Sequence, residues 1–300
     1  MMFYFAAGYF FDIDSPLPFV DKCSLFRYNW GWRRIAVFDC SERVVFFVFR
    51  TVLVLTYIGV MSIITLPFCI LLLLLRLISK KAASKLGQPF ADAVCFWPIF
   101  LLSGGKLTVE GRENIPKGAV LFAGNHRSMY DILAGYMAIP ALHSTSFIAK
   151  YEMRHVPFLS WWMRILNCKF LNRSDPKEGL KTIQSAIADT KEGFSMFIEP
   201  EGTRNRGEGL LPFKPGSLKI AERTGCPVVP VAMIGTDNLL EKQYPKIRAS
   251  KVTVIIGKPI ETANLTRDQK VELPNVVRGQ IKEMLISHGV AFPAEETVSE

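Results

Sequence analysis

The amino-acid sequence predicts an α/β fold, in which a central mixed sheet is layered by helices, with a membrane-associated helical segment near the N-terminus. Two observations lead to this prediction. Beyond residue 104, apolar runs of strand length alternate with stretches of helical length, a pattern typical of α/β sheets. Before that point, residues 51–75 contain no charged side chain, and soluble core helices rarely run so long without charge. We therefore divide the chain into two parts, residues 1–103 and residues 104–300.

The N-terminal extension is rich in aromatic residues, among them Trp30 and Trp32. Aromatic side chains of this kind suit the headgroup region of a bilayer, where Trp and Tyr are enriched. An ordinary packed extension explains the composition equally well. No basic region precedes an apolar core here, so the segment does not have the pattern of a signal peptide.

The uncharged residues 51–75 predict contact with a membrane. As a helix they would extend about 37 Å, which exceeds the roughly 30 Å of hydrocarbon in a bilayer. Pro67 lies inside the segment and is expected to kink the helix or end it. A second apolar stretch, residues 91–102, follows a basic linker. Two arrangements fit this pattern, a tilted span and a hairpin that lies within one leaflet.

A first polar motif follows the apolar run at residues 119–123, and a stretch of helical length begins near residue 132. This order predicts a strand-to-helix turn, with His126 where the strand ends and Asp131 where the helix begins. If Asp131 accepts the Nδ1 proton of His126, Nε2 is free to take a proton from an alcohol, and the ordinary histidine pKa of about 6.5 suits that task. The spacing also fits a capping box, in which Asp131 accepts amide protons, and one carboxylate can do both.

A second polar motif, Glu199 to Arg204, follows the strand-like run at residues 195–198. Gly202 permits a ligand to approach the backbone closely, and the planar guanidinium of Arg204 suits a phosphate or a carboxylate. An arginine in such a loop is usually a solvated surface residue. Together with the first motif, however, the loop predicts an anion-binding site beside a base.

The remaining elements follow from apolar runs and from capping residues. Asp175 and Pro176 begin a helix that ends before Gly193, and Gly225 ends another that starts at Ser217. A last helix is expected within residues 267–287. The predicted strands are residues 107–109, 119–123, 146–149, 196–198, 228–234 and 252–256.

Four blocks, in this order, resemble the glycerolipid acyltransferase family that includes the 1-acylglycerol-3-phosphate acyltransferases. They are His126 with Asp131, residues 169–173, residues 201–204 and residues 228–232. The chain departs from the family pattern at two positions. Glu199 stands where an apolar residue is frequent, and Asn205 stands where serine is frequent; both changes bear on which acceptor is used.

The resemblance implies a role for each matching residue. His126 would be the catalytic base and Asp131 would orient it. The substrate-binding residues that the resemblance implies are Lys169, Arg173, Glu201, Gly202, Thr203 and Arg204. Residues 104–300 would then be the catalytic domain.

The function implied by the resemblance is that of a membrane-bound acyltransferase. It would move a fatty acyl group from an acyl thioester to the sn-2 hydroxyl of lysophosphatidic acid and give phosphatidic acid. Acyl-coenzyme A or acyl carrier protein would supply the thioester as a co-substrate, and no cofactor is expected. Because such donors reside in the cytoplasm, we expect the catalytic domain on the cytoplasmic side of the membrane.

Three alternatives stay open. The acceptor could be glycerol 3-phosphate or another lysophospholipid, the chain could be a non-catalytic membrane protein that binds lipid, or His126 could activate water in a lipid hydrolase. The sequence has no Gly-x-Ser-x-Gly elbow, no His-Glu-x-x-His and no Cys-x-x-Cys, so neither a serine hydrolase nor a protein-bound metal is indicated.

The net charge of +9 points to lipid. A nucleic-acid-binding protein would need a basic stripe or a known module, and the sequence shows neither. An anionic bilayer and phosphate-bearing substrates account for the excess of basic residues. The six cysteines lack the dense spacing of a disulfide scaffold, which favours a reduced, intracellular catalytic domain.

Overall fold

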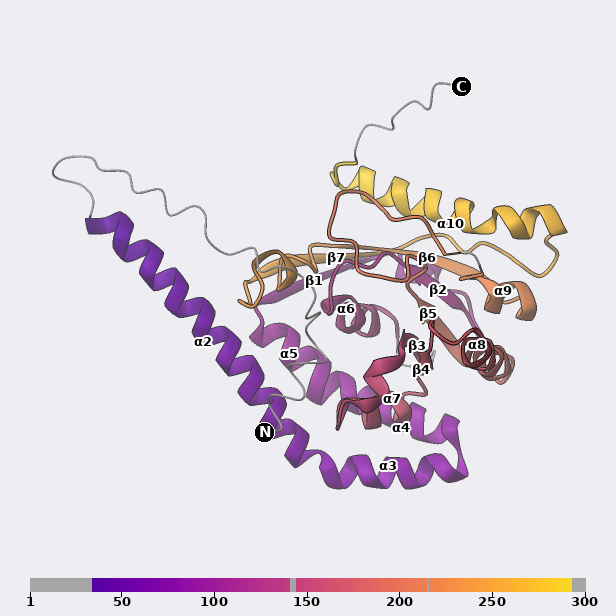
Figure 1. Cartoon of the computed structure of the whole chain (residues 1–300), viewed down its shortest axis with the longest axis horizontal. Coiled ribbons are helices and arrows are strands. Elements are labelled where there is room, and N and C mark those ends of the chain that lie inside the picture. Colours follow the sequence, from indigo (N-terminus) through magenta and orange to yellow (C-terminus); the bar gives the residue numbers. More distant parts are fainter. Residues whose placement is uncertain (1–33, 141–143, 215, 293–300) are drawn as a thin grey trace.

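A seven-stranded sheet lies at the centre of the protein, with strand order β1-β7-β6-β2-β5-β3-β4 (Figure 1). The computed structural model describes residues 34–140, 144–214 and 216–292. The strands are β1 (Gly105–Glu110), β2 (Leu121–Gly124), β3 (Thr145–Lys150), β4 (Lys169–Leu171), β5 (Ser195–Ile198), β6 (Val228–Ile234) and β7 (Ser250–Ile256). Strands β6 and β7 pair antiparallel and the other neighbours pair parallel, which confirms the expected mixed sheet. Strand β4 was not expected from the sequence.

Helices cover both faces of the sheet because successive side chains of each strand point to opposite faces. Phe122 of β2 belongs to the cluster formed with α6 (Tyr130–Ala138), whereas its neighbours Leu121 and Ala123 belong to the opposite cluster. The second cluster includes side chains of α8 (Pro176–Lys191), α9 (Lys219–Thr224) and α10 (Arg267–Ser287). Figure 1 shows α10 above the sheet and α6 below it.

The ends of these helices follow the capping residues that the sequence offers. The Asp175 side chain accepts hydrogen bonds from the amides of Lys177 and Glu178, and Pro176 occupies the first turn of α8. Gly225 takes the left-handed conformation with φ of 71° and ends α9. Thr266 and Gln269 form a full capping box at the start of α10. These local interactions explain why the predicted and the observed helix boundaries agree closely.

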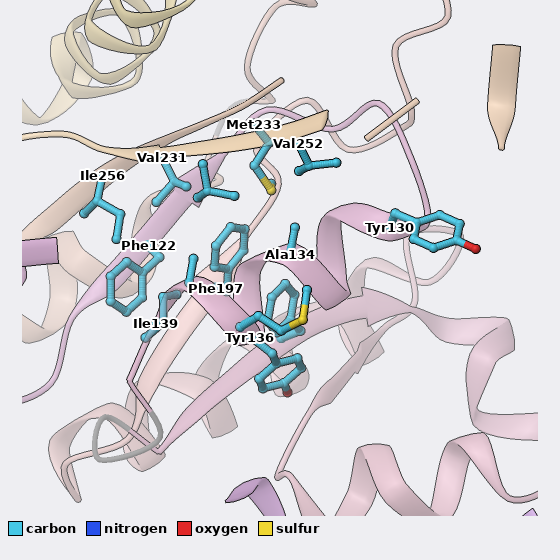
Figure 2. Close-up of a cluster of buried hydrophobic side chains, with 14 of the residues drawn as sticks. Phe122, Tyr130, Ala134, Tyr136, Ile139, Phe197, Val231, Met233, Val252 and Ile256 are labelled. Atoms are coloured by element: carbon cyan, nitrogen blue, oxygen red, sulfur yellow. The ribbon is translucent and has the colours of Figure 1, made fainter. Parts of the chain in front are cut away.

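The core beneath the candidate site is aromatic. Figure 2 shows Phe122 and Phe197 gathered near α6, which carries Ala134 and Tyr136. The rings of Phe147 and Phe197 stack with their centroids 4.5 Å apart. Gly124 ends β2 against this core, where an added Cβ would lie 2.8 Å from the Phe197 ring. The rigid aromatic packing therefore fixes the place where β2 gives way to the first polar motif.

The packing of α10 on the sheet gives a prediction for stability. Ile281 is fully buried on this helix, whereas Ile286 on the same helix is 50% exposed. We expect Ile281→Val to lower the free energy of unfolding by about 1 kcal/mol, since it removes one methylene from a close-packed core. The same change at Ile286 should have almost no effect. Urea unfolding of the detergent-solubilised protein measures both, and equal losses would contradict the packing described here.

The predicted membrane segment forms two helices, α2 (Arg34–Ile64) and α3 (Leu66–Ile78), that meet at Thr65. Pro67 lies in the first turn of α3, which confirms the expected break near this residue. Within the part of the chain that the structure describes, no single helix is long and apolar enough to cross a bilayer. The pair Val48–Ile64 and Leu66–Ile78 passes that test together, by length and composition, with a bend of 58°. A tilted span across the membrane and a hairpin within one leaflet therefore both remain predictions.

The helix α3 is apolar on two sides. Cys69 and Leu72 are buried against Ile165 of α7 (Leu159–Ile165), while Leu74, Leu77 and other apolar side chains are exposed. The second apolar stretch comprises the end of α4 (Lys80–Ala91), a π-helical turn at Asp92–Phe96 and α5 (Trp97–Leu102). The aromatic extension that precedes residue 34 lies outside the described residues. The division at residue 104 stays a prediction.

The described cysteine thiols are all free. They belong to Cys69, Cys95, Cys168 and Cys226.

Candidate active site

The first polar motif is fastened to the sheet by a buried asparagine. The side chain of Asn125 donates to the carbonyl of Met233 at 2.9 Å and accepts from the amide of the same residue at 2.7 Å. Met233 belongs to β6, the neighbour of β2, so the two strands are tied at the point where the motif begins. The sequence reasoning did not single out Asn125, because its partner is 108 residues away.

The structure brings His126 and Asp131 together. The Nδ1 atom of His126 lies 2.9 Å from Oδ2 of Asp131, which is fully buried. The same Oδ2 accepts hydrogen bonds from the amides of Arg127 and Ser128, each at 2.7 Å. The carboxylate thus holds the turn before α6 and the imidazole at once, as one of the sequence alternatives allowed. Within the described part of the chain, Nε2 of His126 has no hydrogen-bond partner.

A further carboxylate adjoins the same ring. Oε1 of Glu199 lies 3.0 Å from Nδ1 of His126. Burial by itself lowers the pKa of His126, but the charge of Glu199 and the hydrogen bond to Asp131 outweigh it and raise this pKa to about 10. Burial also raises the pKa of Glu199. The sequence analysis noted Glu199 only as a departure from the family pattern.

The cationic residues of the second motif lie around Gly202. This residue has a φ of 75°, and a Cβ added there would lie 3.1 Å from Cγ of Lys214 and 3.5 Å from Nη1 of Arg173. Arg173 is exposed, and its guanidinium has no ion-pair or hydrogen-bond partner within the described chain. Arg204 pairs with Glu241 at 3.3 Å. Three basic side chains therefore surround one loop next to the histidine.

This loop also offers backbone donors. The amide of Gly202 is used, since it donates to the carbonyl of Glu199 at 3.0 Å. The amides of Thr203 and Arg204 donate to no protein group that the structure describes, and Thr203 is exposed. A developing negative charge or a phosphate beside this loop would find these two N–H groups available.

Comparison with known proteins assigns the chain to a family. The family model for acyltransferases matches residues 106–234. The 1-acyl-sn-glycerol-3-phosphate acyltransferase of Saccharomyces cerevisiae is 32% identical over 230 residues, which cover 75% of this chain and 74% of the relative. The chain belongs to the 1-acyl-sn-glycerol-3-phosphate acyltransferase family. The enzyme of the same name from Borreliella burgdorferi is 33% identical over 61% of this chain and 73% of its own length.

A solved structure agrees with this acyltransferase assignment. The crystal structure of the 1-acyl-sn-glycerophosphate acyltransferase PlsC from Thermotoga maritima is similar with a TM-score of 0.69 at 27% sequence identity. The match covers 84% of this chain and 100% of that one. The α/β architecture of this acyltransferase is therefore shared with that enzyme.

Glu201 has partners that differ from those its family match suggests. Its Oε1 accepts from the amide of His126 at 2.8 Å and its Oε2 accepts from the amide of Leu211 at 2.9 Å. The residue is almost fully buried, and this burial raises its pKa. Since both oxygens are already bonded to backbone donors, the structure gives Glu201 the task of joining the two polar loops of the acyltransferase site.

Lys169 likewise lies in a structural ion pair. Its ammonium contacts the buried carboxylate of Asp189 and donates to Oγ of Ser185 at 3.1 Å, both on α8. No contact joins it to His126 or Arg204 among the residues that the structure describes. The expectation that it binds substrate rested on the family block alone, which could not reveal that α8 supplies its partners.

One carboxylate links the histidine turn to the cationic loop. Glu241 accepts from the amide of Met129 at 2.8 Å and from the hydroxyl of Ser128, and it also pairs with Arg204. It lies in a short 3-10 turn, Glu241–Gln243, that the sequence patterns did not indicate. Its contacts set the position of Arg204 relative to His126.

Atoms of His126, Asp131 and Glu199 lie within 4.8 Å of one another, near enough to hold a metal ion. The sequence motifs gave no sign of this donor group. Nδ1 can bind a metal only without its proton, whereas its contacts with two carboxylates are those of a protonated ring nitrogen. We therefore assign the group to an imidazole that is held through its proton.

Proposed function

We propose that this protein transfers a fatty acyl group from an acyl thioester to the sn-2 hydroxyl of 1-acylglycerol 3-phosphate, giving phosphatidic acid. One observation carries the proposal. His126 is held through Nδ1 by Asp131, which leaves Nε2 without a protein partner among the described residues, and a cationic loop lies next to it. The acyltransferases of the same family that are named for this reaction support the choice of acceptor.

The reaction needs no covalent enzyme intermediate, since a thioester is already activated. Nε2 of His126 takes the hydroxyl proton of the acceptor as its oxygen bonds to the thioester carbonyl carbon. The C–S bond then breaks, and the thiolate that leaves takes up the proton. The free amides of Thr203 and Arg204 are suited to stabilise the negative charge that develops on the carbonyl oxygen.

The phosphate of the acceptor would be held by the basic side chains around Gly202. Arg173 is the best test of this assignment, because Arg204 already pairs with Glu241. We expect Arg173→Gln to raise the KM for lysophosphatidic acid about 10- to 100-fold, the effect of one lost charge-assisted hydrogen bond, with a smaller change in kcat.

A matched control for this variant is Arg223→Gln, which removes an exposed guanidinium from α9. It should leave the KM unchanged. Steady-state kinetics with lysophosphatidic acid presented in detergent micelles gives both values. An Arg173→Gln enzyme with a normal KM would contradict the phosphate assignment.

The bilayer is the expected location of the enzyme. Exposed apolar side chains of α2 and α3, among them Phe49, Ile63, Leu74 and Leu77, support attachment through these helices. The catalytic domain would face the cytoplasm, where acyl thioesters reside. No cofactor takes part in the proposed reaction, and acyl-coenzyme A or acyl carrier protein supplies the acyl group.

One assay separates the candidate functions. The purified protein is incubated with an acyl thioester and with lysophosphatidic acid, glycerol 3-phosphate or lysophospholipids with substituted headgroups. Equal amounts of free thiol and phosphatidic acid are expected with lysophosphatidic acid. Free fatty acid in place of the diacyl product would indicate a hydrolase, and no thiol release with any acceptor would indicate a non-catalytic lipid-binding protein.

A further inference from the structure

The carboxylate of Glu199 has no place in the reaction described so far, yet it lies 3.0 Å from the ring nitrogen of the base. Glu199 directly follows β5, and His126 follows the end of β2 by two residues. Because β2 and β5 are parallel neighbours, their carboxyl ends meet at one edge of the sheet. This pairing places the two side chains together although they are far apart in the sequence.

The two carboxylates beside Nδ1 are held in different ways. Asp131 is fixed by the amides of Arg127 and Ser128 and has the geometry of a hydrogen bond to the ring. Glu199 meets the same nitrogen as an ion pair, and its Oε1 has no hydrogen-bond partner although it is buried. The Glu199 side chain is only 14% exposed, so solvent screens it poorly. It therefore acts on the ring mainly through its charge.

The other charged groups near the ring do not cancel this pair. Glu201 and Glu241 each accept amide hydrogen bonds from the loop that carries His126. Arg127 pairs with Asp237, and Arg204 pairs with Glu241. Arg173 also attracts the Glu199 carboxylate, but this attraction is weaker than the one between Glu199 and His126. Among the residues that the structure describes, the imidazole thus has two carboxylates at Nδ1 and no cation in contact with it.

We propose that Glu199 is a positioning residue of the active site, which holds the imidazole of His126 together with Asp131 and sets how tightly that ring retains its second proton. The proposal rests on the proposed function, because it concerns the base of that same reaction. With Glu199 ionised, a proton on Nε2 is stabilised by two neighbouring carboxylates. The base then becomes available only when the pair formed by His126 and Glu199 releases one proton.

The pH dependence follows from the sign of this interaction. A nearby negative charge raises the pKa of a histidine, and a base with a raised pKa becomes active only at higher pH. Removing the charge of Glu199 should therefore make the base available at lower pH. In Glu199→Gln, we expect the acid limb of kcat/KM to move to lower pH by about 1 to 3 units, the shift that a close opposite charge produces.

Glu208→Gln is the matched control, because it removes an exposed carboxylate from the same loop. It should leave the acid limb where it is in the unaltered enzyme. If Glu199 served only to pack the loop, Glu199→Gln would change the height of the pH profile and not the position of its limb. An unmoved limb would overturn the proposal.

A titration of the ring provides a second readout that needs no catalysis. The protein is labelled with ¹³C-histidine in detergent micelles, and the signal of His126 among the four histidines is identified with His126→Gln. We expect its pKa far above the ordinary value of about 6.5 in the unaltered protein and lower in Glu199→Gln. An ordinary pKa in the unaltered protein would refute the role of Glu199 even if the variant failed to fold.

The two readouts separate this inference from the proposed function. If Glu199→Gln changes neither the acid limb of kcat/KM nor the pKa of His126 but acyl transfer is observed, the proposed function stands and the role of Glu199 is refuted. If the pKa of His126 is raised and falls in Glu199→Gln, but the protein transfers no acyl group, the effect of Glu199 on the ring stands and the proposed reaction is refuted.

Discussion

Replacing His126 with alanine is expected to lower the rate of acyl transfer by about 10²- to 10⁴-fold, the range found when a general base is removed. The imidazole is the only group within the described residues that presents an available ring nitrogen beside the cationic loop. Alanine leaves the backbone contacts of this turn intact, since the amide of residue 126 still donates to Glu201 and its carbonyl still accepts from Asn205. The loss should therefore appear in kcat in a protein that still folds, although Asp131 and Glu199 lose their shared partner.

Initial rates of thiol release at saturating acceptor measure this change, with circular dichroism and urea unfolding as tests of the fold. His155→Ala is the matched control, because this imidazole is exposed and lies in the 3-10 turn Tyr151–His155. It should retain normal rates. A folded His126→Ala protein that still acylates at a near-normal rate would exclude the proposed mechanism.

The second large effect is expected for Asp131→Ala. Here the imidazole loses its hydrogen bond, and the buried amides of Arg127 and Ser128 lose their acceptor. Each buried amide without a partner costs about 1–3 kcal/mol of stability, so both folding and catalysis should suffer. We expect kcat to fall on the order of 10²-fold, because the ring loses its hydrogen bond to Asp131 and only Glu199 remains at Nδ1.

Asp131→Asn should be the milder change. The amides of Arg127 and Ser128 both point to the Oδ2 position, so the amide oxygen of asparagine is expected to occupy it. Nδ1 of His126 then still donates to an oxygen, and only the charge is lost. Measurements of kcat and of the urea midpoint distinguish the variants, with Asp268→Ala on the exposed start of α10 as control. Equal damage by Ala and Asn would contradict the assigned orientation.

Much of the fold was accessible from the sequence because it is decided locally. Asp175 caps α8 through amides that lie within three residues of it, and Gly225 ends α9 directly after Thr224. Pro67 marked the break between α2 and α3 for the same reason. Strand β4 was not predicted because only two apolar residues, Phe170 and Leu171, stand between Lys169 and Asn172, so the sequence shows no apolar run there.

In the candidate site, too, contacts between residues close in sequence were predictable and contacts between distant residues were not. The pairing of His126 with Asp131 was predictable, since one turn of chain separates them and the strand-to-helix transition leaves little freedom. The location of the cationic loop beside them was predicted from the two polar motifs, each of which follows an apolar run, and the resemblance to a family agreed with it. The partners of Lys169 and Glu201 did not follow, because Asp189 and the amide of His126 reach them only through the packing of α8 and of β2 against β5.

The sequence by itself thus predicted the contact of His126 with Asp131 and several helix ends, all of which depend on neighbours along the chain. Only the tertiary structure placed Glu199 at the ring of His126, Asn125 on Met233 and Glu241 on Arg204. These contacts arise from the strand order, which brings β5, β2 and β6 side by side. Residues far apart in sequence meet where such strands end, and no local pattern encodes that meeting.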